Sequence, residues 1–247
     1  MPAMTSPDWI SCAECRHRDG AGFVGHSDGD AEFMTGFKMG RGTLPAGGSI
    51  EADGATPVLL TLYSGWALRL GGSRSTKEAI LGVVLPGDLV GLDTVLSECG
   101  AFRLVALTDV TYCQFNPGRW HELLARPALA ERLLRIQTLA RAEAEERRMA
   151  AAALSATGNL CHLMLTLHNA LRRRKLAPEG SFRLPLRRKQ LAAALGLSPL
   201  HLRRVLADLE KNKVFDLREG RVTLHDLSRL RSLAGNPQFG RSALPLI

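Results

Sequence analysis

The segment from Arg187 to Leu209 constrains the chain most, because it has the pattern of two short helices joined by a tight turn. Gln190 to Leu195 is a small alanine-rich helix in which Leu191 and Leu195 share one face. Gly196 lets the chain turn, and Ser198 is a good N-cap for a second helix. In that helix one face carries the spacing typical of contact with a core: Leu202, Val205, Leu206 and Leu209. The pattern is a helix-turn-helix and predicts binding to duplex DNA.

The opposite face of the second helix is basic and is expected to enter the major groove. An arginine on that face can bond guanine O6 and N7 together, which is worth about 1–3 kcal/mol of discrimination between bases. The alternative is an ordinary helical hairpin with a solvated basic face. The residues predicted to contact DNA from this motif are Arg187, Ser198, Pro199, Leu200, His201, Arg203, Arg204 and Lys211.

A hairpin is expected directly after the second helix. Val214 to Leu217 and Arg221 to Leu224 are short β-prone runs around Arg218-Glu219-Gly220. A hairpin in this place is a wing, and Arg218 and Arg221 are predicted to touch phosphate. Such contacts fix the register on DNA without reading the sequence.

The charge balance agrees with a nucleic-acid partner. The net charge is +8, and basic runs crowd the second half of the 247 residues, at Arg172–Lys175, Arg187–Lys189 and Arg203–Arg204. No run of 18 apolar residues occurs, and no basic segment followed by an apolar one opens the chain. We therefore expect a soluble, cytoplasmic protein without a membrane partner, whose five cysteines do not form disulfides.

The first half predicts a β-roll or barrel. Glycines punctuate short apolar runs, at Val58–Tyr63, Trp66–Leu70, Ala79–Leu85, Leu104–Leu107 and Val110–Phe115.

A glycine-free helix is expected from Pro127 to Leu154. Its seam of Leu129, Leu133, Ile136 and Ala140 steps by 4, 3 and 4 residues, which suits pairing with the same helix of a second subunit. The seam therefore predicts a homodimer. The alternative is a helix packed on its own sheet.

The order of roll, long helix and winged helix-turn-helix resembles the CRP/FNR family, named after the cyclic-AMP receptor protein and the fumarate-nitrate-reduction regulator. The motifs that carry the resemblance are Ser64-Gly65-Trp66-Ala67, Leu85-Pro86-Gly87-Asp88-Leu89-Val90-Gly91-Leu92-Asp93, Ala106-Leu107-Thr108-Asp109-Val110 and the helix-turn-helix. The second of these is similar to the FNR branch.

The resemblance implies an α+β fold and a homodimeric transcription regulator. It also implies a palindromic operator and contact with RNA polymerase. The expected segments are a cysteine-containing segment at 1–26, a cyclic-nucleotide-binding-like β-roll at 27–120, a dimerisation helix at 121–155, the winged helix-turn-helix at 156–236 and a tail at 237–247.

The family's cyclic-nucleotide site is not matched. Its receptors hold the ligand phosphate with an Arg-Ser pair shortly before a late strand, and here Gly100 and Ala101 stand there. Asp88 replaces the usual Glu near the turn. A phosphate site without its arginine is poor, which argues against cyclic AMP.

The cysteines suggest a different signal. Oxygen sensors of the FNR type hold an iron–sulfur (4Fe–4S) cluster with N-terminal cysteines and one strand cysteine, which Cys12, Cys15 and Cys113 resemble. The family's third N-terminal cysteine is replaced by Ala21, so the candidates for a fourth ligand are Asp19, His17 and Cys99. The open alternatives are direct thiol redox sensing, a tetrahedral metal site on the same residues, a haem that senses nitric oxide or another effector in the roll, and DNA binding without any signal.

The recognition helix departs from the FNR pattern. Leu200 stands where a Glu is common, Arg203 stands at a position that is usually Ser or Gly, and Arg204 keeps the family's Arg. Leu200 cannot accept from cytosine N4 as a Glu does, so the operator should differ from the family's common sites.

The sequence argues against an enzyme and against an RNA binder. It contains no P-loop or H-E-x-x-H motif. Aromatic residues are 5% of the chain, too few to favour a protein that stacks RNA bases.

Overall fold

The computed structural model describes residues 11–15, 17, 27–72, 78–97 and 100–236. The described chain divides into two compact units at the bond between Ile136 and Gln137, inside a long helix. The first unit is rich in strands and the second in helices, so the expected α+β class is confirmed. None of the described helices is long and apolar enough to span a bilayer.

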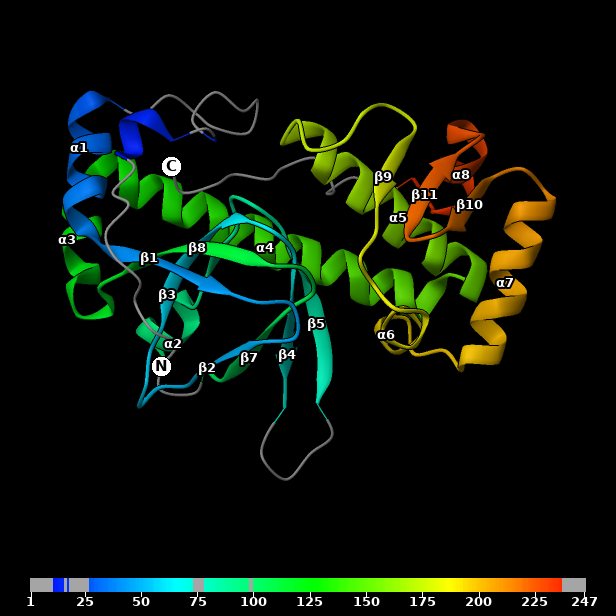
Figure 1. Ribbon diagram of the computed structural model, residues 1–247, viewed down its shortest axis with the longest axis horizontal. Coiled ribbons are helices and arrows are strands. Elements are labelled where there is room, and N and C mark those ends of the chain that lie inside the picture. Colours follow the sequence, from blue (N-terminus) through cyan, green and yellow to red (C-terminus); the bar gives the residue numbers. More distant parts are fainter. Residues whose placement is uncertain (1–10, 16, 18–26, 73–77, 98–99, 237–247) are drawn as a thin grey trace. The chain divides into compact units, whose positions relative to one another are not determined.

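Two four-stranded antiparallel sheets build the first unit (Figure 1). One has the order β1-β8-β3-β6 and the other β2-β7-β4-β5. The strands are β1 (Lys38–Leu44), β2 (Ser49–Ala52), β3 (Leu59–Ser64), β4 (Ala67–Gly71), β5 (Ala79–Val84), β6 (Leu89–Val90), β7 (Phe102–Ala106) and β8 (Val110–Phe115). All five apolar runs that the sequence offered as strands lie on one of these, with ends displaced by a few residues at most.

The strand β8 separates two apolar clusters, because its successive side chains point to opposite faces of the sheet. Tyr112 joins Leu60 and Leu62 in a cluster that draws on both sheets. Cys113 and Phe115 join the other cluster with residues of the N-terminal segment and of the helices. The sheet around β8 is therefore buried on both faces.

The turn with the motif that begins at Leu85 is stabilised by a hydrogen bond between its own residues. The Asp88 carboxylate accepts from the Leu85 backbone N–H at 2.8 Å, so Asp88 closes the turn. Gly91 follows with φ of +98° and begins α2 (Leu92–Leu96). A Cβ at this glycine would lie 1.7 Å from the carbonyl oxygen of Val58. The close approach to β3 explains why the motif needs a glycine here.

Helices that the sequence analysis did not identify surround the roll. The helix α1 (Asp28–Phe37) begins at Ser27, whose hydroxyl accepts from the Asp30 N–H, and buries Met34 and Phe37. A short 3-10 turn, η1 (Cys12–Glu14), precedes it, and η2 (Pro117–Arg119) and α3 (Trp120–Leu124) follow β8.

The helix α4 (Pro127–Ala153) matches the expected long helix. Two residues of the predicted dimer seam, however, are already buried against other parts of the same chain. Leu129 and Leu133 are 0% and 5% exposed and belong to the cluster of Phe115 and Cys113. Ile136 packs against the same cluster, whereas Ala140 is exposed. Assigning Leu129 and Leu133 to a partner helix was wrong, because the roll of the same chain covers them.

The second unit holds the predicted DNA-binding motif. After α4 it contains α5 (Ala156–Arg173), β9 (Ser181–Arg183), α6 (Arg188–Ala194), α7 (Pro199–Lys211), β10 (Phe215–Arg218), β11 (Arg221–Leu224) and α8 (Leu227–Leu233). The three strands form an antiparallel sheet in the order β10-β11-β9. The third strand, β9, was not predicted.

Candidate nucleic-acid interface

The helices α6 and α7 form the predicted helix-turn-helix, and their local chemistry explains the turn. The Gln190 side chain accepts from the Arg187 N–H at 2.9 Å at the start of α6. Gly196 has a φ of +66°, in the left-handed region that favours glycine. The Ser198 hydroxyl accepts from the His201 N–H at 3.2 Å, and Pro199 is the first residue of α7.

The two faces of α7 divide as the spacing predicted. Its apolar face is buried, with exposed fractions of 7% or less at Leu202, Val205, Leu206 and Leu209. Its other face is open to solvent. All the residues of α7 and its N-cap that the sequence offered as DNA contacts are exposed: Ser198, Pro199, Leu200, His201, Arg203, Arg204 and Lys211.

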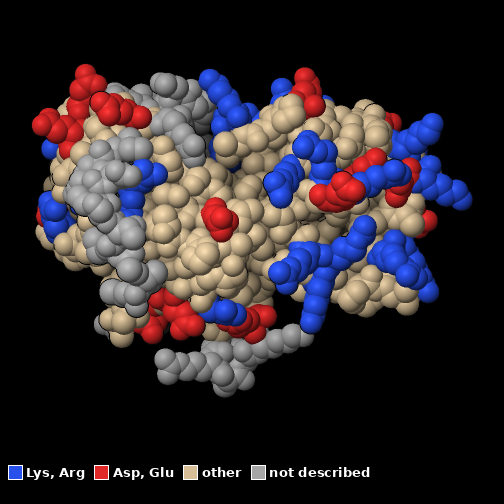
Figure 2. All heavy atoms as spheres, in the orientation of Figure 1, with Lys and Arg blue, Asp and Glu red and all other residues tan. Residues whose placement is uncertain are grey.

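The basic side chains of this face are free to meet an anion. Among the described residues, no acidic side chain forms an ion pair with Arg203, Arg204 or Arg187. Leu200 lies on the same face and is 50% exposed. Figure 2 shows Lys and Arg side chains gathered where Figure 1 draws α6, α7 and the neighbouring sheet. The surface is therefore suited to a polyanion.

The wing is a tight hairpin. Glu219 and Gly220 connect β10 to β11, and both have positive φ values, of +50° and +72°. Two such residues make the turn whose twist matches antiparallel strands. Arg218 pairs with Glu210 of α7, which ties the hairpin to the second helix of the motif.

Comparison with known proteins agrees with this architecture. Residues 159–233 match the model of the Crp-like helix-turn-helix domain. The nitrogen fixation regulation protein FixK of Bradyrhizobium diazoefficiens is 28% identical over 162 residues, which are 64% of this chain and 66% of FixK. The transcriptional activator protein Anr of Pseudomonas protegens is 26% identical over 169 residues, 68% of this chain and 69% of Anr.

Solved structures support the same fold. FixK2 from Bradyrhizobium japonicum superposes with a TM-score of 0.67 at 17% identity, covering 78% of this chain and 96% of FixK2. A CRP/FNR-family transcriptional regulator from Thermus thermophilus gives a TM-score of 0.60 at 20% identity, covering 79% and 98%. The matched domain, the relatives and the shared fold together decide the assignment.

The chain is similar to regulators of the CRP/FNR family in its helix-turn-helix domain, in its relatives and in its fold. It is a DNA-binding transcription regulator, and the family is one of regulators and not of enzymes. The resemblance that the motifs suggested is therefore confirmed.

A second candidate site of this regulator lies where the N-terminal segment meets β8. Cys12 and Cys113 are 1% and 8% exposed and share one apolar cluster, and Cys15 is half-buried. Burial raises the pKa of the Cys113 thiol; Cys15 and Cys12 add to the rise, while Lys38 and Arg41 oppose it. The structure thus brings together the three cysteines that the sequence singled out.

Hydrogen bonds hold the N-terminal segment in this place. The Cys12 N–H donates to the Thr35 hydroxyl at 2.9 Å. His17 Nε2 lies 2.6 Å from the Tyr63 carbonyl oxygen, so Nε2 carries the proton and donates. A protonated nitrogen cannot bind a metal, which removes Nε2 of His17 as a candidate ligand.

The described residues do not fit a 4Fe–4S cluster. Such a cluster normally needs four thiolates. Within the ranges that the structure describes, no group of three or more Cys, His, Asp or Glu side chains is placed to hold a metal ion. The other two candidate ligands, Asp19 and Cys99, lie outside the described residues.

The sequence analysis did not identify one basic residue that lies beside the candidate nucleic-acid interface. Arg183 lies on β9 and pairs in register with Arg221 of β11. A signal was available, because Phe182, Leu184 and Leu186 alternate with Arg183 and Pro185 as a half-buried strand requires.

Proposed function

We propose that this regulator binds a palindromic duplex operator as a homodimer, with the exposed face of α7 in the major groove. The observation that carries the proposal is the division of α7 into a buried leucine and valine face and an open basic face. Arg203 and Arg204 are free of acidic partners in the described chain and can reach base edges. Arg187, Ser198, His201 and Lys211 supply phosphate contacts beside them.

The test is an unbiased selection of duplex sequences with the full-length protein. We expect a two-fold symmetric site with half-sites about one helical turn apart. Arg204→Gln should weaken binding to the selected site by about 10- to 100-fold and relax the preference at one base pair in each half-site. Arg135→Gln, an exposed change of equal charge on α4 outside the residues proposed for the dimer contact, is the matched control and should alter neither.

A protein that selects no sequence, or an Arg204→Gln variant that keeps its base preference, would contradict this mode of binding. Contact with RNA polymerase is an expectation from the family. It is tested by transcription in vitro from a promoter that carries the selected site.

The dimer should form through a face of α4 other than the predicted seam. Six exposed residues of α4 recur at steps of 4, 3, 4, 3 and 4, which is the spacing of a coiled-coil seam: Leu134, Thr138, Arg141, Glu145, Arg148 and Ala152. Leu134 is 68% exposed, the highest value among the large apolar side chains of the described residues. We propose that these residues of two subunits meet.

For the signal, we propose that the regulator responds to oxidation of Cys12, Cys15 and Cys113. Cys15 is the most accessible of the three and would react first with a peroxide, giving a sulfenic acid and water. A second thiol then displaces hydroxide from that sulfur, which forms the disulfide and a second water molecule. The buried Cys113 thiol is mostly protonated at neutral pH, so reaction with it should be slow.

Two measurements test the signal. The first is DNA binding by the wild-type protein and by the Cys15→Ser and Cys113→Ser variants, with reductant and with peroxide. Cys161→Ser, on a buried helical cysteine outside the group, is the control. Binding by wild type that ignores peroxide would overturn the thiol proposal. The second is anaerobic purification with iron and sulfide analysis, in which bound iron and sulfide would favour the cluster instead.

A further inference from the structure

The strand β9 places a third arginine beside the wing. In the antiparallel register, Arg218 of β10 lies opposite Arg221 of β11, and Arg221 lies opposite Arg183 of β9. We call these three residues the arginine row. The adjacent row on the same face contains Asp216, Thr223 and Ser181.

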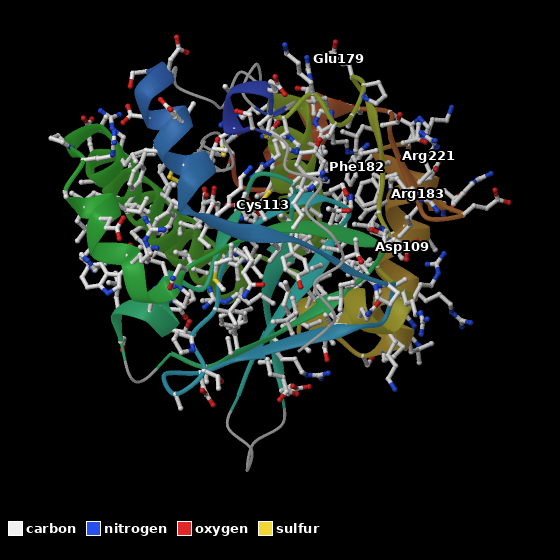
Figure 3. The ribbon with its side chains drawn as sticks, turned by 60° about the vertical axis from the view of Figure 1, so that its left-hand side comes forward. Asp109, Cys113, Glu179, Phe182, Arg183 and Arg221 are labelled. Carbon is white, nitrogen blue, oxygen red and sulfur yellow. The ribbon has the colours of Figure 1, made fainter. Side chains whose placement is uncertain are left out.

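The arginine row lies on the solvent side of the sheet. Phe182 and Val222, the neighbours of Arg183 and Arg221 along the strands, are 1% and 0% exposed. Successive side chains of a strand point to opposite faces, so the arginines point away from the core. Figure 3 shows Arg183 and Arg221 together on neighbouring strands, on the opposite side from Phe182.

Two of the three arginines have no ion-pair partner among the described residues. Arg218 pairs with Glu210, and the nearby Asp216 lies 2.9 Å from His225 Nε2. Across the described residues, Arg183 and Arg221 form no ion pair. Like charges directly opposite one another destabilise a sheet, so the row costs stability in the free protein. A bound polyanion would remove that cost.

We propose that the arginine row binds backbone phosphates of duplex DNA beside the groove that α7 enters. The proposal rests on the proposed function, and it adds β9 and Arg183 to the interface. The Arg218–Glu210 pair links the row to α7, so phosphate contacts on the sheet fix the position of the recognition helix. The Thr223 and Ser181 hydroxyls can donate to the same phosphates.

The experiment measures DNA affinity of the full chain against salt concentration for Arg183→Gln and Arg221→Gln. Two probes are used, the best duplex from the selection and an unrelated duplex of equal length. Each substitution should reduce the slope of log K against log salt by about 1 per subunit, on both probes. The affinity ratio between the probes should stay constant, because phosphates carry no sequence information.

Matched variants distinguish phosphate binding by the arginine row from a general effect of net charge and from contacts to base edges. Arg135→Gln removes the same charge from α4, outside the residues proposed for the dimer contact, and should leave the slope unchanged. Arg204→Gln should reduce the ratio between the probes. Arg183→Lys keeps the charge and should keep most of the slope. The free Arg183→Gln protein should melt at the same temperature as wild type or higher, because a repulsion is relieved.

Wild type that discriminates between the probes, with unchanged slopes in Arg183→Gln and Arg221→Gln, would overturn the arginine row and leave the proposed function intact. Wild type that binds neither probe would overturn the proposed function. A lower melting temperature for Arg183→Gln would assign the side chain a structural role and contradict the proposal.

Discussion

Leu200 is the residue at which this regulator should differ most from its relatives in reading DNA. It is half-exposed on the open face of α7, where an apolar side chain can only pack against a thymine methyl. Leu200→Glu introduces an acceptor for cytosine N4. The variant should select a site with a new preferred base at one position of each half-site, with discrimination changed by about 1–3 kcal/mol.

The selection described above measures this shift directly. Lys211→Gln, at the far end of the same helix, serves as the control and should weaken binding without changing the preferred bases. An unchanged preference in Leu200→Glu would place this residue outside base contact.

His168 should make the second unit sensitive to acid. It is 1% exposed on α5, and neither ring nitrogen has a partner among the described residues. Burial lowers its pKa; Arg172 and Arg231 add to this effect, and Glu179 opposes it. Below the ordinary pKa of histidine, near 6.5, His168 becomes protonated in the unfolded chain but stays neutral in the folded chain. Stability should therefore fall as the pH falls from about 7 towards 5, by up to about 1.4 kcal/mol per pH unit.

Urea unfolding followed over this pH range tests the effect. His168→Leu removes the titrating group and fills the same apolar site beside Phe182, so its stability should vary less with pH. His201→Asn, a change at an exposed histidine, should keep the wild-type dependence. Equal pH profiles for wild type and His168→Leu would contradict the assignment.

At the scale of an element, two glycines should respond oppositely to alanine. Gly91 has no room for a Cβ against the Val58 carbonyl and has a φ of +98°, so Gly91→Ala should destabilise the roll by several kcal/mol. Gly36 lies in α1 with nothing within 4 Å of its Cβ position. Gly36→Ala should stabilise by about 0.5–1 kcal/mol. Thermal melts of the two variants give both signs, and a stable Gly91→Ala protein would show that β3 yields at this turn.

Elements with a local signal could be predicted from the sequence. The caps and spacing of α7 depend on residues within that helix or directly before it, and the turn at Glu219-Gly220 depends on residues of the hairpin itself. The strand β9 was not predicted because a strand of three residues gives a weak pattern, although the apolar residues Phe182 and Leu184 flank the charged Arg183. The helix α1 was hidden because its glycines and acidic residues are typical of loops.

The packing partner of a helix could not be predicted. Leu129 and Leu133 have the spacing of a coiled-coil seam, but a helix that packs on its own roll has the same spacing. For a related reason, the sequence predicted which cysteines form the candidate site but not their environment. The motif identified the three cysteines, whereas the burial that raises the pKa of Cys113 comes from distant residues around β8.

For the whole molecule, dimerisation should control DNA binding, because two recognition helices must lie about one turn of DNA apart. The exposed seam on α4 is mostly polar, and Leu134 is the large apolar residue of that set. Its burial against a second subunit would stabilise the dimer by about 1.5–3 kcal/mol per side chain.

Leu134→Glu places two like charges within this contact, which should shift the protein to monomer. Light scattering after size-exclusion chromatography measures the mass, and titration of the selected duplex measures the effect on DNA binding. We expect a loss of affinity for the full palindrome and little change for a single half-site. Leu124→Glu, on the exposed side of α3, is the matched control and should remain dimeric. A Leu134→Glu protein that stays dimeric would exclude this face of α4, since the roll already covers Leu129 and Leu133.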